Sequence, residues 1–206
     1  MKLFLASANP HNAAELSAFA KASEEAAGVR IEIIPAQAVG GMPPVVEDAG
    51  TFVGNARKKA QALRPCLPAG AWALADDSGL CVDALAGRPG VDSAYFAGPR
   101  GDGAANLAQL IAVMRKVPEP ERSAQFRCVL LVTGPDAQEE IFEGSCGGRL
   151  LHGPRGRAGF GYDPLFVPNG REQTFAEMDA ELKNRLSHRA RAWARLAEWV
   201  RQSSIA

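Results

Sequence analysis

The sequence predicts an α/β protein with a mixed central sheet flanked by helices. Apolar runs of strand length alternate along the chain with amphipathic segments of helical period. Two strand-like runs flank the turn Gly134–Gln138 and predict an antiparallel pair. No internal repeat and no low-complexity linker interrupts the pattern, so we expect residues 1–206 to form a single domain.

The first half of the chain contains three expected strands and two expected helices. Residues 2–6 form an apolar run typical of a buried strand, and residues 30–36 alternate as a second strand. A helix from about 13 to 26 and a helix over 51–63 each place small or apolar residues on one face. Residues 71–75 predict a short central strand that ends at the turn-like sequence DDSG.

The second half begins with a helix over 103–116, in which apolar residues recur at helical spacing. Strands over 125–134 and 139–147 follow, and then a glycine-rich loop leads into the apolar segment 162–168. Thr174 and Glu177 form a capping box that predicts a helix over 174–186. The final helix, 188–201, carries an apolar stripe made of Trp193, Leu196, Ala197 and Val200.

Composition excludes several classes of partner. Lys and Arg number 23 and Asp and Glu number 23, so there is no basic field for a nucleic-acid polymer or an anionic membrane. A nucleic-acid-like partner would therefore be small, such as a nucleotide. The four cysteines form no CxxC pair and are expected to be reduced or buried. The apolar N-terminal run is too short for a signal peptide, so we expect a cytoplasmic protein.

The stretch LASANPHNAAEL, Leu5–Leu16, places polar and turn-forming residues between the first strand and the first helix. One interpretation is a plain turn and helix cap, in which Asn12 with Glu15 forms a capping-box-like pair. The other is a phosphate-binding loop over Ser7–Asn12. The local pattern allows both interpretations.

Asp76 and Asp77 directly follow the expected central strand, where ligands collect in open α/β sheets. Neighbouring strand residues point to opposite faces, so only one of the two is expected to face a ligand fully. Carboxylates are what Mg²⁺ prefers when it also binds substrate phosphates. Glu47 is a further candidate carboxylate. Alternatively, DDSG is only a turn.

Lys59 and the glycine-rich run 153–164 are candidates for nucleotide contacts. Lys59 could reach a phosphate or simply be solvated. The run places Phe160, Tyr162 and Asp163 close together, which suits stacking and hydrogen bonding to a nucleobase, although a mobile loop is the alternative. It matches neither a Walker A loop nor a GxGxxG fingerprint.

The segment SHR, 187–189, puts cations at a helix start. Ser187 is the expected N-cap, which places His188 and Arg189 in the first turn, close to Lys183. The helix dipole disfavours a cation there by about 0.3–1 kcal/mol. An electron-rich ligand opposite these side chains would account for them, and random placement is the alternative.

Taken together, these segments resemble the inosine triphosphate pyrophosphatase family, whose members act on non-standard purine nucleoside triphosphates. The resemblance runs nearly end to end, and its most specific parts are the DDSGL block followed by GRPG, and GFGYDP followed by SHR. The other matching stretches are SANPHNAAE, GTFVGNARKKA, RSAQFRCVLLV, FEGSCGGRL and TFAEM. The resemblance implies an elongated fold with two lobes, a long mixed sheet and an active-site cleft between the lobes. It also implies a homodimer and Mg²⁺.

The resemblance also implies roles for individual residues. Asp77 corresponds to a metal ligand and proton acceptor, with Glu47 and Asp76 supporting the metal. The residues expected to contact substrate are Ser7, Ala8, Asn9, Pro10, His11, Asn12, Lys59, Ser78, Phe160, Gly161, Tyr162, Asp163, Lys183, His188 and Arg189.

The implied reaction is hydrolysis of ITP, dITP or XTP to the nucleoside monophosphate and pyrophosphate, which cleanses the nucleotide pool. Arg189 or His188 could donate to the 6-oxo group of such a base, whereas the 6-amino group of adenine would leave a donor facing a donor. The family loop normally has lysine where this chain has Asn12. One alternative is therefore a nucleotide-binding protein with weakened or lost catalysis. Two further alternatives, independent of Asn12, are a phosphohydrolase that forms an aspartyl phosphate and a purely structural or protein-interaction role.

Overall fold

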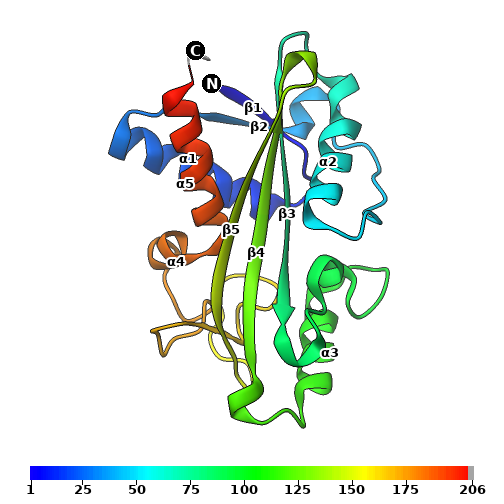
Figure 1. Cartoon of the computed structure of the whole chain (residues 1–206), viewed down its shortest axis with the longest axis vertical. Helices are drawn as coiled ribbons and strands as arrows, with labels where there is room; N and C mark the ends of the chain where they lie inside the picture. Colours follow the sequence, from blue (N-terminus) through cyan, green and yellow to red (C-terminus); the bar gives the residue numbers. More distant parts are fainter. Residues whose placement is uncertain (204–206) are drawn as a thin grey trace. The chain divides into compact units, whose positions relative to one another are not determined.

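The computed structural model describes residues 1–203 and confirms the α/β prediction (Figure 1). Six strands form one sheet in the order β2-β1-β3-β4-β5-β6. β1 pairs in parallel with β2 and β3, and β5 pairs antiparallel with β6, so the sheet is mixed. The strands are β1 Lys2–Leu5, β2 Glu32–Pro35, β3 Trp72–Val82, β4 Ser123–Thr133, β5 Glu139–Leu150 and β6 Phe166–Pro168.

Five helices accompany the sheet within the described residues, and four of them start at a side-chain cap. Asn9, Thr51, Asp102 and Asp179 each accept a hydrogen bond from a backbone N–H of the first turn that follows. None of the described helices is long and apolar enough to cross a membrane. The helices are α1 Pro10–Ala27, α2 Phe52–Leu63, α3 Gly103–Met114, α4 Ala180–Leu186 and α5 His188–Gln202.

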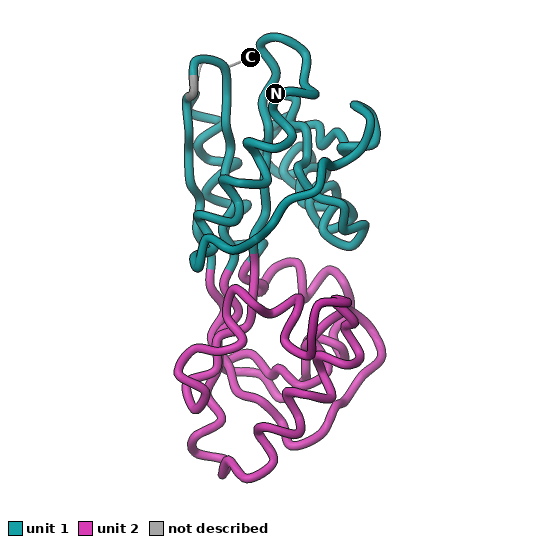
Figure 2. Tube along the Cα trace, turned by 90° about the vertical axis from the view of Figure 1, so that its right-hand side faces the viewer, with its two compact units in different colours: residues 1–77, 128–144, 189–206 teal, residues 78–127, 145–188 magenta. Residues whose placement is uncertain are grey.

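Two compact units divide the chain (Figure 2). Unit 1 comprises residues 1–77, 128–144 and those from 189 onward, and unit 2 comprises 78–127 and 145–188. The core of unit 1 gathers apolar residues of β1, α1, β4 and α5, including the predicted stripe of α5. The core of unit 2 gathers Leu80, Leu110 and the three phenylalanines Phe126, Phe166 and Phe175.

The central strand is longer than predicted. β3 continues from Trp72 through DDSG to Val82, so the turn interpretation of DDSG is wrong. Leu80 and Val82 are buried in the core of unit 2, and this burial favours extended backbone beyond the aspartates. A Cβ at Gly79 would lie 2.1 Å from the carbonyl oxygen of Gly90, so glycine is required where these two segments meet. Asp76 and Asp77 therefore lie within a strand and not at its end.

The capping box at Thr174 does not start a helix. The backbone N–H of Thr174 does donate to Glu177 Oε2 at 2.8 Å, as in a capping box. However, α4 begins only at Ala180, where Asp179 Oδ1 accepts from the N–H of Leu182 at 2.7 Å. The prediction of a helix from 174 is therefore wrong by six residues. All four cysteines are free, as expected.

A buried arginine connects the end of α3 to the end of β5 in unit 2. Arg122 is 1% exposed and donates only to backbone carbonyls in its recorded hydrogen bonds. The acceptors, at 2.7–3.0 Å, are the carbonyl oxygens of Met114, Val117, Leu150 and Leu151. Met114 is the last residue of α3 and Leu150 is the last residue of β5, while Val117 and Leu151 lie just beyond these elements, where helix and strand ends leave carbonyl oxygens in need of donors.

Arg122→Met should destabilise the protein strongly. The substitution keeps an apolar stem but removes a donor from four carbonyl oxygens, of which only that of Met114 is known to keep another donor, the N–H of Val117 at 3.0 Å. Each buried acceptor left unsatisfied costs about 1–3 kcal/mol. We expect a loss of about 3–5 kcal/mol in the free energy of unfolding, measured by urea denaturation. The control is Arg100→Met at an exposed arginine. Equal losses in the two variants would contradict this account of Arg122.

Candidate active site

The predicted phosphate loop lies between β1 and α1, and its helix cap is Asn9. Asn9 has extended backbone and accepts from the N–H of His11 at 2.9 Å, while Ser7 Oγ accepts from the N–H of Asn9 at 3.1 Å. Pro10 is the first residue of α1, as its fixed φ favours. Ala8, Asn9, Pro10 and His11 are exposed. The interpretation of Asn12 as a cap is therefore wrong, and the loop presents the first turn of an 18-residue helix.

Asn12 instead contacts a carboxylate of the central strand. Its Nδ2 donates to Asp76 Oδ1 at 2.9 Å. Its own Oδ1 is buried and has no hydrogen-bond partner among the described residues. Because Asn12 lies inside the first turn of α1, it ties the helix start directly to β3.

Asp76 is the most heavily paired acid of unit 1 and is 2% exposed. Arg189 holds it with two hydrogen bonds, from Nε at 2.9 Å and from Nη2 at 3.2 Å, and the Cys128 thiol adds a contact at 3.4 Å. Burial alone would raise the pKa of Asp76, but the Arg189 guanidinium outweighs it and the pKa falls to about 2. Arg189 also donates to Glu15 through Nη1.

With these donors on both of its oxygens, Asp76 does not offer a free carboxylate edge to a metal ion. Asp76 neutralises Arg189 and links β3 to α1 and α5. Figure 1 shows α1 and α5 on one side of the sheet and α2 on the other.

Asp77 faces the opposite side of the strand, toward α2. Lys59 Nζ donates to Asp77 Oδ1 at 2.7 Å, to the backbone oxygen of Asp76 at 2.9 Å, and pairs with Glu47 Oε2 at 2.8 Å. Asp77 Oδ2 is buried and has no hydrogen-bond partner within the described part of the chain. The expectation that the two aspartates point in opposite directions is confirmed.

The two aspartates differ in pKa as well as in direction. Burial raises the pKa of Asp77, Lys59 lowers it, and Glu47 raises it again, which leaves it at about 7. Asp77 can therefore exchange a proton near neutral pH, whereas Asp76 stays ionised. The same strand presents two adjacent acids with different chemistry.

Asp77 and Glu47 are the carboxylates that could hold a divalent metal. No cluster of three or more His, Cys, Asp or Glu side chains suited to a metal occurs among the described residues. Mg²⁺ is commonly bound by one or two carboxylates together with substrate phosphates and not by an all-protein cage. The unpartnered Asp77 Oδ2 beside Glu47 fits that mode of binding.

Unit 2 contains the aromatic and basic residues of the glycine-rich segment. Lys183 Nζ, nearly buried, donates to Asp163 Oδ2 at 2.8 Å and lies 4.7 Å from the centroid of the Phe160 ring. The N–H of Phe160 donates to the same Asp163 oxygen at 2.9 Å. A Cβ at Gly159 would lie 2.1 Å from that oxygen, so this glycine lets the loop close onto Asp163. Gly161 has a φ of 60°, a left-handed conformation that favours glycine.

Tyr162 has a packing role that the sequence did not indicate. It is buried in the core of unit 2, its hydroxyl donates to the carbonyl oxygen of Ser93 at 2.8 Å, and burial raises its pKa. Phe160, half-buried, is therefore the aromatic residue of this loop that suits stacking on a base.

Residues at two of the four points where the chain passes from one unit to the other complete the predicted set. His188 belongs to unit 2, where its ring stacks on Phe126 with centroids 4.8 Å apart. It is the first residue of α5, and Ser187 before it is also the C-cap of α4. Ser78, half-buried, follows Asp77 along β3.

Sequence reasoning missed two contributors to the site of unit 1. Glu15 was interpreted only as a capping partner of Asn12, yet it pairs with Arg189. Cys128 is a free and buried thiol, as the sequence predicts, but its contact with Asp76 is not predicted. Glu15 lies 174 residues from Arg189, and Cys128 lies 52 residues from Asp76, so no local pattern indicates either contact.

Comparison with known proteins gives matches along nearly the whole chain. The model of the Ham1 family matches residues 3–199. A curated protein of Opitutus terrae named dITP/XTP pyrophosphatase is 60% identical over 98% of this chain and its own full length. A protein of the same name from Desulforamulus reducens is 43% identical, over 96% of this chain and 94% of its own.

Solved structures agree with these sequence matches. The structure of a HAM1 protein from Coxiella burnetii superposes with a TM-score of 0.85 at 33% identity, covering 98% of this chain and 100% of that one. A nucleoside-triphosphatase / dITP/XTP pyrophosphatase from Mycobacterium abscessus gives a TM-score of 0.73 at 40% identity, over 95% and 97% of the two chains.

The raised pKa of Asp77 predicts a fall in stability with pH. Its pKa is about 7 in the folded protein against 3.8 ordinarily, so the folded state holds the proton more tightly. The free energy of unfolding of the metal-free protein should therefore fall as the pH rises from about 4 to 7, by up to about 4 kcal/mol. Asp77→Asn should remove most of this fall, as measured by urea denaturation in the presence of EDTA.

The control for this pH series is Asp92→Asn, which removes an exposed aspartate of unit 2. It should leave the pH dependence between 4 and 7 unchanged. A wild-type protein with flat stability over that range would show that Asp77 ionises as an ordinary surface acid.

Proposed function

Because the chain belongs to the Ham1 family, we propose that it hydrolyses non-standard purine nucleoside triphosphates, namely ITP, dITP and XTP, to the monophosphate and pyrophosphate. The observation that carries the proposal is the geometry at Asp77: a buried carboxyl whose Oδ1 accepts from Lys59 Nζ at 2.7 Å and whose Oδ2 has no hydrogen-bond partner within the described residues. The curated relatives from Opitutus terrae and Desulforamulus reducens carry the corresponding name.

In this proposal the residues around Asp77 prepare the attacking water. Asp77 accepts the proton of the water, and Lys59 fixes the orientation of the carboxyl through Oδ1. Glu47 and Asp77 would hold Mg²⁺, which when bound neutralises charge on the triphosphate. The loop Ser7–Asn12 would bind the phosphates through the first turn of α1, where backbone N–H groups and the helix dipole favour an anion.

The base would be bound by the residues of unit 2. Phe160 supplies a ring for stacking, and the Lys183–Asp163 pair supplies polar groups beside that ring. We assign the hydrogen bond to the 6-oxo group to His188 in preference to Arg189. Arg189 already donates hydrogen bonds from three of its five N–H groups to Asp76 and Glu15.

The remaining parts of the proposal rest on the family resemblance. They are a single domain of two lobes with an active-site cleft, a homodimer, a cytoplasmic location and Mg²⁺ as the preferred ion.

Product analysis tests the proposed reaction. With inosine triphosphate and Mg²⁺, we expect inosine monophosphate and pyrophosphate, detected as orthophosphate only after inorganic pyrophosphatase is added. ATP and GTP should be poor substrates. Asp77→Asn should lower kcat by about 10²–10⁴-fold, the usual contribution of a proton acceptor.

Two outcomes would favour the alternatives. Direct release of orthophosphate would indicate a phosphohydrolase that forms an aspartyl phosphate. Binding of inosine triphosphate without turnover would indicate a nucleotide-binding protein with lost catalysis. Either outcome would overturn the proposed activity.

We also propose that Asn12 acts through Asp76, as a positioning residue, and not by direct contact with phosphate. Its amide donates to the carboxylate that holds Arg189. Asn12→Ala should lower kcat/KM about tenfold, the kinetic equivalent of one hydrogen bond to a charged group. The loss should shrink in an Arg189→Lys background, because the two residues share Asp76.

The measurement is a double-mutant cycle on kcat and KM with inosine triphosphate. Asn169→Ala is the control, since this exposed asparagine lies outside the candidate site and its loss should leave kcat/KM unchanged. Additive effects of Asn12→Ala and Arg189→Lys, or a higher kcat/KM in Asn12→Lys than in the wild type, would indicate a direct phosphate contact instead.

A further inference from the structure

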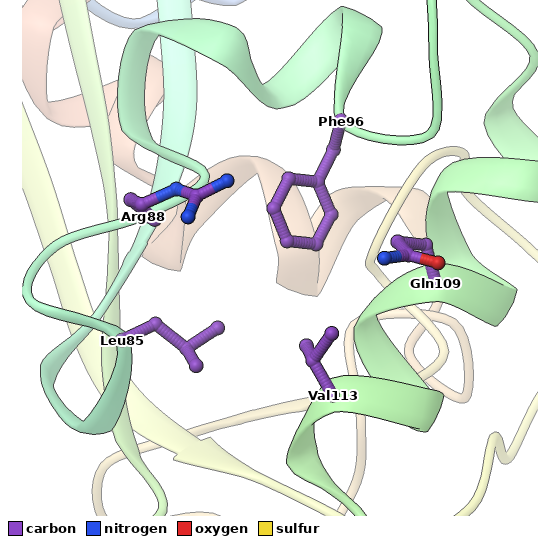
Figure 3. A pocket seen from close by; sticks show the side chains of 5 residues that line it. All are labelled: Leu85, Arg88, Phe96, Gln109 and Val113. Atoms are coloured by element: carbon purple, nitrogen blue, oxygen red, sulfur yellow. The ribbon is translucent and has the colours of Figure 1, made fainter.

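A cavity of about 330 Å³ lies in unit 2, and its lining includes no residue assigned to the candidate active site. Figure 3 shows its lining, which is Leu85, Arg88, Phe96, Gln109 and Val113. Leu85 ends the short 3₁₀ turn Asp83–Leu85, Phe96 directly follows the turn Gly90–Tyr95, and Gln109 and Val113 lie four residues apart on one face of α3.

Hydrogen bonds on two sides hold this lining in place. Asn106 of α3 is 4% exposed, accepts from the N–H of Ala97 at 2.7 Å and donates to the carbonyl oxygen of Ala94 at 2.8 Å. It thereby fixes the segment that carries Phe96 against the helix that carries Gln109 and Val113. On the other side, the N–H of Arg88 donates to the carbonyl oxygen of Leu85 at 3.1 Å. The cavity is therefore pre-formed, as ligand sites usually are.

The lining combines apolar walls with one cation. Leu85, Phe96 and Val113 are hydrocarbon, and Val113 is 39% exposed, which is high for a large apolar side chain. The guanidinium carbon of Arg88 lies 5.8 Å from the centroid of the Phe96 ring. No acidic side chain of the described residues forms a recorded ion pair with Arg88. Its N–H groups thus remain available for an anion beside an aromatic ring.

We propose that this cavity binds a small aromatic anion, that is, a planar ring bearing a carboxylate or phosphate. The ring would lie between Leu85 and Val113 with its edge or face against Phe96, where offset or edge-to-face contacts are favourable. The anionic group would accept from Arg88, and the Gln109 amide would bond to a polar substituent.

The size of the cavity limits the ligand. A volume of 330 Å³ is what about eleven water molecules occupy in the liquid. A ligand of about ten to fifteen non-hydrogen atoms therefore fits. A molecule of that size in a partly open site is expected to bind with a Kd of about 0.1–1 mM. This proposal is independent of the proposed hydrolysis.

The test is a titration followed by NMR, using the Gln109 side-chain amide and the Val113 methyl signals of the full chain without Mg²⁺. The probes are benzoate and phenyl phosphate, with benzyl alcohol as the neutral ring and inorganic phosphate as the ring-free anion. We expect at least one aryl anion to shift both signals and to bind at least tenfold more tightly than either control compound. The ratio of the two aryl anions identifies the preferred anionic group.

Variants separate this cavity from other binding sites. Arg88→Gln should abolish the preference for aryl anions over benzyl alcohol, and Phe96→Leu should weaken aryl binding while keeping an apolar wall. Arg100→Gln, at an exposed arginine outside the lining, should change neither.

The proposal would be overturned if neither aryl anion shifted the signals, or if benzyl alcohol or inorganic phosphate bound as tightly as the aryl anions. Unchanged aryl binding in a folded Arg88→Gln protein would also overturn it. Shifts of Gln109 that follow protein concentration without any probe would also overturn it, because they would assign the cavity to contact with another copy of the chain.

Discussion

The buried ion pair between Asp76 and Arg189 is the interaction on which the site of unit 1 depends. Asp76 comes from the middle of β3 and Arg189 from the first turn of α5, and both side chains are almost fully buried. Asn12 and Glu15 of α1 join the same network. Removing one partner of such a pair leaves an uncompensated buried charge, which costs about 3–5 kcal/mol. Asp76 and Arg189 thus also fix the position of the start of α1, where we propose that phosphates bind.

One consequence is that two adjacent aspartates become chemically distinct. The alternation of side chains along a strand directs Asp76 to Arg189 and Asp77 to Lys59. Arg189 offers a bidentate partner and keeps Asp76 ionised, whereas Lys59 divides its donors between Asp77, Glu47 and a backbone oxygen. Burial therefore dominates at Asp77 and leaves a proton acceptor near neutral pH. Pairs of titratable groups whose environments separate their pKa values are typical of catalytic sites.

Unit 2 also contains buried cations that need partners, and it supplies them with different residues. Its buried cations have either one carboxylate, as Lys183 has Asp163, or backbone carbonyls, as Arg122 has at the end of α3. Both arrangements give a buried cation hydrogen-bond acceptors, which helps to hold the glycine-rich segment and the end of α3 in place. The cavity beside α3 differs, because the guanidinium of Arg88 contacts a ring and pairs with no carboxylate among residues 1–203.

The sequence by itself determined the α/β class, the mixed sheet, the apolar stripe of α5 and the family, because periodicity and contiguous motifs are local properties. It also predicted that Asp76 and Asp77 face opposite ways, because alternation is a property of any strand. Only the tertiary structure decided that β3 continues through DDSG, that Asn9 and not Asn12 caps α1, and that Glu15 and Cys128 join the site. Each of these depends on burial or on a partner far along the chain. The environment that sets a pKa or selects a strand over a turn exists only once distant segments have packed together.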